Sequence, residues 1–224
     1  MSFLSFFKEY KKFGIFFSIL CIIIISIIYN ILNVKKPLPI YQPAMVSQEL
    51  VDSTIQYQKK YHKIADFSLV NQNGDTITQE TYKDKIYVAD FFFTTCQTIC
   101  PIMTDHMYQI QKEIINDDDV MLLSHSVTPQ IDSVAQLKKY AKEKGVIDRK
   151  WNLVTGDKKQ IYKLARKSYL AVKTDGNGDQ YDMVHTENFM LIDKKRQIRG
   201  FYDGTNPEDI DRLLEDITTL KEES

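Results

Sequence analysis

Residues 86–101 read IYVADFFFTTCQTICP, and this stretch decides the fold. Its first eight positions are almost all apolar, with β-branched and aromatic side chains, which is typical of a strand buried on both faces of a sheet. The spacing of apolar residues over 101–115 predicts a helix directly after it. Cys96 and Cys100 are therefore expected at a strand-to-helix junction.

Strands and helices continue to alternate on either side of this junction. The sequence predicts one hairpin around Asn73-Gly74 and a second hairpin near the C-terminus. This alternation is typical of an α/β domain with a central mixed sheet and helices on both faces. We place that domain at residues 63–224, which is long enough to bury a core without a metal or a disulfide. The predicted strands are 67–70, 76–78, 86–93, 120–127, 151–154, 187–193 and 197–202, and the predicted helices are 101–115, 131–144, 158–168 and 207–220.

The N-terminal region reads as a membrane anchor. Residues 13–32 (FGIFFSILCIIIISIIYNIL) contain no charge and are long enough to cross a bilayer as one helix. A cleaved signal peptide would end at small residues, and a lipoprotein signal at Cys21 would need small neighbours, where Ile19 and Leu20 stand. We therefore predict an uncleaved single-pass helix.

The anchor divides the chain into four parts. Lysines on its N-terminal side favour a cytoplasmic N-terminus over residues 1–12, so the soluble domain faces the periplasm or another extracytoplasmic space. Residues 33–62 are expected to form a tether, because Pro37, Pro39 and Pro43 break helical structure.

The charge balance argues against a nucleic-acid-binding protein. The chain has 29 Lys and Arg against 30 Asp and Glu, which leaves a net charge of -1 and no excess of basic residues for a nucleic-acid surface. It has three cysteines, and Cys21 belongs to the predicted anchor. The outer domain therefore carries two cysteines, too few for a disulfide scaffold, and any cysteine chemistry is local.

The spacing of Cys96 and Cys100 allows two chemistries. On a helix, residues four apart point the same way, about 5–6 Å apart at Cβ. That separation allows a disulfide, and it also allows two thiolates to bind one soft metal ion. Thr95 is placed to cap the helix, whose N-terminus would lower a thiol pKa. The alternative is a pair of inert buried cysteines.

A third metal ligand would have to be one of four histidines. His185 directly precedes a predicted buried strand, and spacing alone leaves it open whether it reaches the cysteines. His125 at the end of a central strand is expected to be a core histidine. His106 faces away from both sulfurs on a regular helix, and His62 lies in the predicted tether.

Together these motifs resemble the Sco/SenC family. The resemblance rests on Cys-x-x-x-Cys-Pro after a strand (91–101), Ser-Val-Thr-Pro at 126–129, Tyr-x-x-Val-His-Thr at 181–186, and the anchor, and it covers residues 65–217. It implies a thioredoxin-like fold and a membrane-tethered copper chaperone for cytochrome c oxidase. It makes Cys96, Cys100 and His185 the ligands of Cu(I) and Cu(II). It implies as partners the copper-accepting oxidase subunit and a copper donor or thiol reductant protein.

The chain departs from the family pattern at three places. Thr98 and Thr128 stand where the family usually has acidic residues, which puts partner recognition or redox tuning in doubt. Val184 adjoins His185 directly, where the family has one residue between them. Met103 and Met107 continue the cysteine face of the helix, and core packing is the favoured interpretation over soft auxiliary ligands.

The main alternative is a thiol–disulfide oxidoreductase. Asp90 precedes Cys96 by six residues, the offset at which thioredoxins carry a buried carboxylate, although a solvated or capped strand aspartate is also open. The longer spacing of the two cysteines, and His185-Thr186 where thioredoxins carry a cis-proline, favour the metallochaperone. Reductase activity of the same cysteines is compatible with that role.

Overall fold

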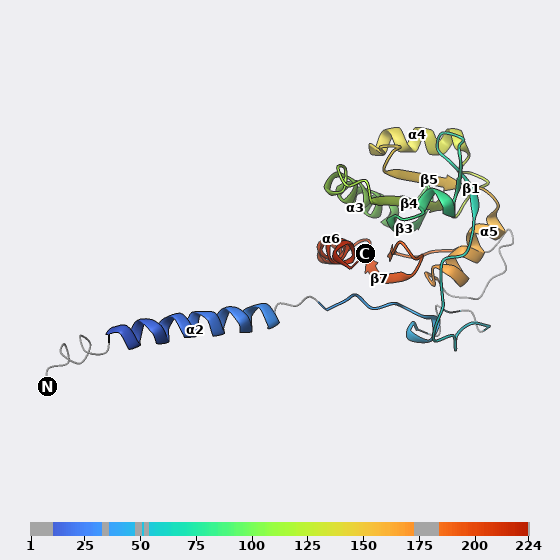
Figure 1. Cartoon of the computed structure of the whole chain (residues 1–224). Helices are drawn as coiled ribbons and strands as arrows, with labels where there is room; N and C mark the ends of the chain where they lie inside the picture. The colour runs from blue at the N-terminus through green and yellow to red at the C-terminus, as the bar shows by residue number, and fades with distance from the viewer. Residues whose placement is uncertain (1–10, 33–35, 48–50, 52–53, 173–183, 224) are drawn as a thin grey trace. The chain divides into compact units, whose positions relative to one another are not determined.

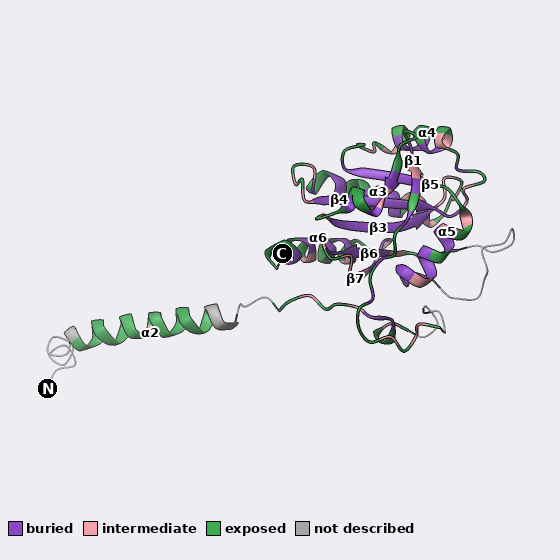
Figure 2. Ribbon diagram, turned by 45° about the vertical axis from the view of Figure 1, so that its right-hand side comes forward, coloured by how far each residue is buried: buried purple, intermediate pink, exposed green. Residues whose placement is uncertain are grey.

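The computed structural model describes residues 11–32, 36–47, 51, 54–172 and 184–223. The chain divides into two compact units, Met1–Pro37 and Leu38–Ser224. The first contains helix α2 (Lys11–Leu32), whose apolar side chains from Phe13 to Tyr29 are largely exposed (Figure 2). Across the described residues, no helix combines the length and the apolar character that a bilayer crossing requires. The transmembrane helix therefore stays a prediction.

The second unit is built on one mixed sheet (Figure 1). Within the described residues its strand order is β2-β1-β5-β4-β3-β6-β7. The three central strands β3, β4 and β5 run parallel, and antiparallel hairpins complete both edges. The predicted α/β class and mixed sheet are confirmed. The strands are β1 (Ser68–Asn71), β2 (Thr76–Thr78), β3 (Ile86–Phe92), β4 (Val120–Ser126), β5 (Trp151–Thr155), β6 (Asn188–Ile192) and β7 (Ile198–Asp203).

Helices cover both faces of this sheet, as the alternation of elements predicts. In β3, which is buried throughout, Tyr87, Ala89 and Phe91 enter one core and Val88 and Phe92 enter the other, because successive side chains of a strand point to opposite faces (Figure 2). The Val88 face packs against α3 (Ile99–Glu113), α4 (Val134–Lys144) and α6 (Pro207–Glu222), and the Tyr87 face packs against α5 (Lys158–Lys163) and the π-helical turn Leu164–Ser168 that follows it.

Helix α4 ends as predicted but begins later. Gly145 closes it in the left-handed conformation with φ +71°, which glycine adopts without strain. Ser133 is its N-cap and accepts a hydrogen bond from the backbone N–H of Gln136. Residues 128–132, predicted as helix from 131, instead form a turn closed by the N–H groups of Ile131 and Asp132 on the carbonyl of Thr128.

Residues 38–41 pack against the sheet, which differs from the predicted tether over 33–62 in this part of it. The N–H of Tyr41 donates to the carbonyl of Ile198 at 2.8 Å, so the segment lies along the β7 edge. The buried Arg199 donates to the carbonyls of Leu38 and Pro39 at 2.7 and 3.1 Å. Prolines prevent a helix here, but they do not prevent an extended segment from docking on a sheet edge.

Candidate functional site

The loop between β3 and α3 carries both cysteines of the domain. Cys96 lies in the loop and is partly exposed, whereas Cys100 lies in the first turn of α3 and is 3% exposed. The N-cap of α3 is Thr98, so the prediction that Thr95 caps this helix is wrong. The helix begins after Cys96, and the two thiols do not share a helical face.

The two sulfurs nevertheless meet at the helix N-terminus. The Sγ of Cys96 accepts the backbone N–H of Cys100 at an N···S distance of 3.4 Å, and it lies 3.6 Å from the hydroxyl of Thr98. Both thiols are free. The first N–H groups of a helix have no partner within the helix, so a thiolate at this position receives hydrogen bonds that would otherwise go to water.

This geometry makes the two thiols unequal. Burial tends to raise the pKa of Cys96, but the backbone N–H groups of Cys100 and Thr98 outweigh it and bring that pKa to about 7. Burial raises the pKa of the Cys100 thiol to about 12, and its hydrogen bond with Cys96 and the nearby Asp90 add to the rise. Cys96 is therefore the accessible thiol, about half ionised at pH 7, and Cys100 is the protonated inner one.

Asp90 is a buried carboxyl group on the cysteine side of the sheet. It is 2% exposed, and its Oδ1 has no hydrogen-bond partner. Burial raises the pKa of Asp90 to about 7, although a hydrogen bond with Ser124 partly offsets this. By alternation along β3 it shares the face of Val88 and Phe92, which packs on α3. The solvated alternative is thus excluded, and Asp90 has the properties of a proton acceptor near Cys100.

The structure does not bring His185 into a cluster with the cysteines. His185 is exposed, between the buried Val184 and Thr186, in the segment that leads into β6. Among the described residues, no group of three His, Cys, Asp or Glu side chains is close enough to hold a metal ion. Residues 181–183 of the Tyr-x-x-Val-His-Thr motif lie outside the described residues.

The other three histidines are buried structural residues. His125 is a core residue as predicted: its ring stacks on Phe91 at 4.8 Å, and burial lowers its pKa to about 4. His106 bonds the carbonyl of Gly204 through Nδ1 at 2.7 Å. His62, predicted in a free tether, is buried and bonds the carbonyl of Ser168 through Nε2 at 2.8 Å.

The methionines of α3 belong to the core. Met103 and Met107 are both 0% exposed and pack in the same apolar cluster as Cys100. This confirms the packing interpretation. They are neighbours of the inner thiol but are not open to an incoming ion.

The sequence analysis missed one polar residue close to this site. Asp132 is 0% exposed and accepts hydrogen bonds from Thr94, two residues before Cys96. Its only signal in the sequence is the run of hydroxyl residues at 126, 128 and 133 around it.

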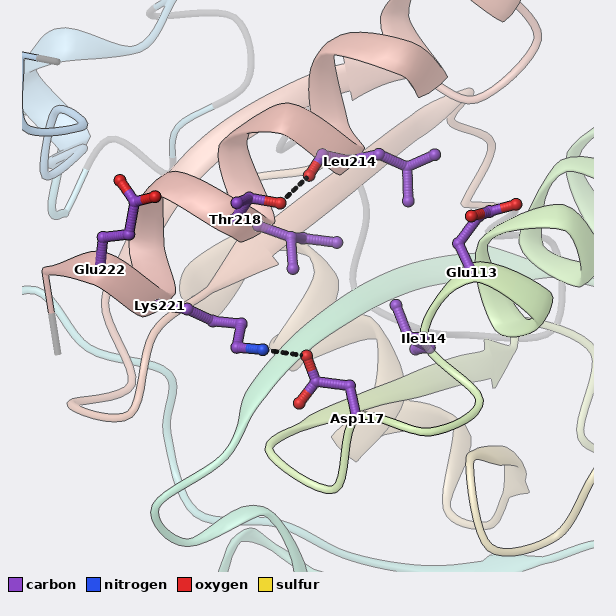
Figure 3. Close-up of a pocket in the computed structure, with 8 residues that line it drawn as sticks. Glu113, Ile114, Asp117, Leu214, Thr218, Lys221 and Glu222 are labelled. Atoms are coloured by element: carbon purple, nitrogen blue, oxygen red, sulfur yellow. Dashed lines mark hydrogen bonds and ion pairs between the residues drawn. The ribbon is translucent and has the colours of Figure 1, made fainter.

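A surface pocket lies away from the cysteines (Figure 3). It has a volume of about 430 Å³ and lies between the C-terminal ends of α3 and α6. Lys221 on α6 forms an ion pair with Asp117 across it (Figure 3). Because α3 rises about 1.5 Å per residue, the pocket lies about 20 Å from Cys100. It has no part in the dithiol site.

Comparison with known proteins decides the family. The family model described as SCO1/SenC matches residues 55–222, which is most of the chain. The chain belongs to the SCO1/SenC family. The resemblance read from its motifs is thereby confirmed.

Relatives and solved structures agree with this assignment. The SCO1 protein homolog of Bacillus subtilis (strain 168) is 32% identical over 165 residues, which cover 71% of this chain and 85% of the relative. The structure of BsSco, a member of the Sco family of cytochrome c oxidase assembly proteins with a disulfide switch, superposes with a TM-score of 0.60 at 32% identity, over 71% of this chain and 93% of that one. Arabidopsis thaliana ScoI with copper bound superposes with a TM-score of 0.56 at 26% identity, over 71% and 98% of the two chains.

Proposed function

We propose that this SCO1/SenC protein carries copper and assists assembly of the dinuclear copper site of a haem-copper (cytochrome c) oxidase, with Cys96, Cys100 and His185 as copper ligands. The observation that carries the proposal is the pair of unequal thiols at the N-terminus of α3. The copper-bound Arabidopsis ScoI and the oxidase-assembly role of the BsSco family support it.

The donor set fits copper. Two thiolates favour Cu(I), and an added imidazole also permits Cu(II), so one site can hold both oxidation states. Cys96 is exposed enough to receive an ion and to release it to a partner. Cys100 needs to lose a proton before it can bind, and the buried carboxylate of Asp90 is a nearby acceptor.

The sheet register supports His185 as the third ligand. Tyr87 pairs with Ile192 and Ala89 with Met190 in the antiparallel β3–β6 ladder. Because the two strands are antiparallel, β6 begins at the end of the sheet where β3 gives way to the cysteine loop, and residue 185 lies three residues before β6. We propose that copper binding draws the exposed His185 toward the two sulfurs.

Copper loading of the full chain tests this assignment. Under anaerobic, reducing conditions we expect one copper per chain, with loss of stoichiometric binding in Cys96→Ser, Cys100→Ala and His185→Ala. Glu187→Ala changes an exposed side chain of the same segment and serves as the matched control, which should retain one copper. Full copper retention in His185→Ala would remove this residue from the ligand set.

The second candidate function is reduction of a disulfide in the oxidase subunit or in another extracytoplasmic protein. The unequal thiols and Asp90 favour it. The Cys96 thiolate would attack one sulfur of the target disulfide and release one target thiolate. Cys100, after giving its proton to Asp90, would attack Cys96 Sγ, release the second target thiolate and leave a Cys96–Cys100 disulfide. Two electrons pass to the target, and an external thiol reductant restores the pair.

His185 separates the two functions. Loss of oxidase assembly in His185→Ala, with unchanged dithiol exchange in vitro, identifies copper delivery as the role of the protein. Normal assembly in His185→Ala together with failure in both cysteine variants identifies the reductase.

We further propose that residues 13–32 anchor the chain in the cytoplasmic membrane, with residues 1–12 inside and the domain on the extracytoplasmic side. The uncharged apolar sequence and the exposed apolar side chains of α2 support this. The full chain should stay in the membrane fraction after an alkaline wash, and a chain beginning at residue 36 should be released.

A further inference from the structure

The carboxylate of Asp132 joins the end of β4 to the cysteine loop. Its Oδ1 accepts the Thr94 hydroxyl at 2.5 Å, and its Oδ2 accepts the Thr94 backbone N–H at 3.3 Å. Oδ2 also accepts the hydroxyls of Ser126 at 2.6 Å and Thr128 at 3.0 Å. A side chain that is 0% exposed thus satisfies four donors from two separate segments of the chain.

The direction of the bond from Thr94 is fixed by a third segment. The Thr94 hydroxyl accepts the Nε2 of Gln136, on α4, at 3.1 Å. A hydroxyl has one hydrogen to donate, and here that hydrogen goes to Asp132. Hydrogen bonds to a carboxylate are about twice as strong as bonds between neutral groups. Thr94 is therefore held both by its backbone and by its side chain.

Holding Thr94 also fixes the backbone that leads to Cys96. The N–H of Cys96 donates to the carbonyl of Phe93 at 3.3 Å, which makes a tight turn around Thr94. At the end of this turn the Cys96 sulfur lies 3.4 Å from the backbone nitrogen of Cys100. A rotation at Thr94 would move the sulfur away from that N–H.

We propose that Asp132 is a positioning residue for the dithiol: by holding Thr94, it keeps the Cys96 sulfur against the backbone N–H of Cys100. The proposal deepens the proposed function and rests on Cys96 being its reactive thiol. A purely structural role would be confined to the turn that Asp132 itself belongs to, where it bonds Ser126 and Thr128. If Asp132 positions the dithiol, loss of the Thr94 hydroxyl should change the reactivity of Cys96. If its role is only structural, loss of the Thr128 hydroxyl should have the same effect as loss of the Thr94 hydroxyl.

The test compares hydroxyl deletions in the full-length, reduced protein. The rate of Cys96 alkylation by iodoacetamide at pH 7 is measured with peptide mapping, and the reduction potential of the pair is measured against glutathione. We expect Asp132→Asn and Thr94→Val to slow alkylation about fivefold, because a displaced Cys96 sulfur loses the N–H donor that makes it reactive. The reduction potential of the pair should fall in the variants whose alkylation is slower, because their reduced form is less stable. The double variant should be no slower than Thr94→Val.

Two controls complete the set. Thr94→Ser retains the hydroxyl and should react at the rate of the unchanged protein. Thr128→Val removes a donor to the same carboxylate without touching the cysteine loop, and its rate should stay within about twofold of that value. If Asp132→Asn does not fold, Thr94→Val still tests the proposal, because it leaves the carboxylate in place.

Several results would overturn the positioning role. These are unchanged rates in Thr94→Val, or equal slowing in Thr128→Val and Thr94→Val. Copper loading of the same variants separates this failure from that of the proposed function. Unchanged alkylation rates with normal loading remove only the role of Asp132, whereas an unreactive Cys96 in the unsubstituted protein with no copper bound removes the proposed function as well.

Discussion

The Sγ of Cys96 accepts the backbone N–H of Cys100, with 3.4 Å between sulfur and nitrogen. The outer thiol is thus stabilised as a thiolate by the backbone of the inner one, while the inner thiol is held in the core under α3. The pair is polarised before any ion or partner arrives. This arrangement suits copper capture and disulfide exchange equally, because both begin with one accessible thiolate.

The pH dependence of alkylation should show this polarity. With the Cys96 pKa at about 7, the rate of modification should reach half its plateau near pH 7, two units below the ordinary value of 9.0. Cys100, with its pKa raised to about 12, should stay unmodified over this range. Mass spectrometry after trypsin digestion assigns the label to one cysteine or the other. A midpoint near pH 9 would show that the backbone donors do not stabilise the thiolate.

The same shift affects stability. Because the folded-state pKa of Cys96 lies below that of the unfolded chain, its contribution to folding is present above pH 9 and is lost as the pH falls toward 7. Cys96→Ser should therefore flatten the pH dependence of the urea midpoint between pH 7 and 9. An unaltered slope would contradict the assignment.

Asp90 should make the free energy of unfolding depend on pH in the opposite direction. Its pKa is raised from 3.8 to about 7, so the folded state loses stability as the pH rises through this interval. Between pH 4 and pH 8, the free energy of unfolding of Asp90→Asn should therefore gain about 4 kcal/mol relative to that of the unsubstituted protein. The same variant should slow closure of the Cys96–Cys100 disulfide, because Cys100 loses its proton acceptor. Urea unfolding at two pH values checks the first effect, and stopped-flow oxidation checks the second.

The core of the fold could be predicted from sequence because its signals are local. The apolar run over 86–93 predicts a buried strand without reference to any distant residue, and β3 spans Ile86–Phe92. Helix α3 begins at Ile99, two residues before the predicted start, with Pro101 in its first turn. Cys96 lies outside this helix, in a loop whose Thr94 is bound by Asp132, 38 residues further along the chain. No pattern in residues 94–100 contains that contact.

The segment after residue 37 could not be predicted for the same reason. Among its described residues its prolines leave only the short 3-10 helix Pro43–Met45, but the carbonyls of Leu38 and Pro39 are bound by Arg199, about 160 residues away. The proposed third ligand is a similar case. His185 could be singled out by its place before a strand, and neither its neighbours in the sequence nor the described structure brings it to the sulfurs.

Arg199 should therefore control how firmly residues 38–41 are held. Its guanidinium forms ion pairs with Asp193 and Glu223 as well as the two carbonyl bonds, and its side chain is 8% exposed. Arg199→Met leaves two carboxylates without their partner, which should lower the free energy of unfolding by about 3 kcal/mol. Limited proteolysis should also cut between residues 36 and 42 much faster than in the unsubstituted protein.

A matched arginine provides the control. Arg212 pairs with Asp209 on the surface of α6, and its side chain is 47% exposed. Arg212→Met should cost less than about 1 kcal/mol and leave the cleavage pattern unchanged. Equal effects of the two substitutions would mean that Arg199 does not fasten this segment.

Substitution by serine should destabilise the fold to different extents at the two cysteines. Cys96 is partly exposed, so Cys96→Ser places its hydroxyl where water can reach it, and the free energy of unfolding at pH 7 should change by less than about 1 kcal/mol. Cys100 is 3% exposed among Met103, Met107 and Phe92, and Cys100→Ser puts a hydroxyl in this apolar cluster, at a cost of about 2 kcal/mol. Cys100→Ala adds no polar group and should destabilise the protein less than Cys100→Ser.

Urea unfolding of the three variants measures the difference. Equal stability of Cys100→Ser and Cys100→Ala would show that the serine hydroxyl finds a partner. If the expected order holds, copper loss in Cys100→Ser can reflect a weakened fold, and Cys100→Ala is the variant that reports on the ligand itself.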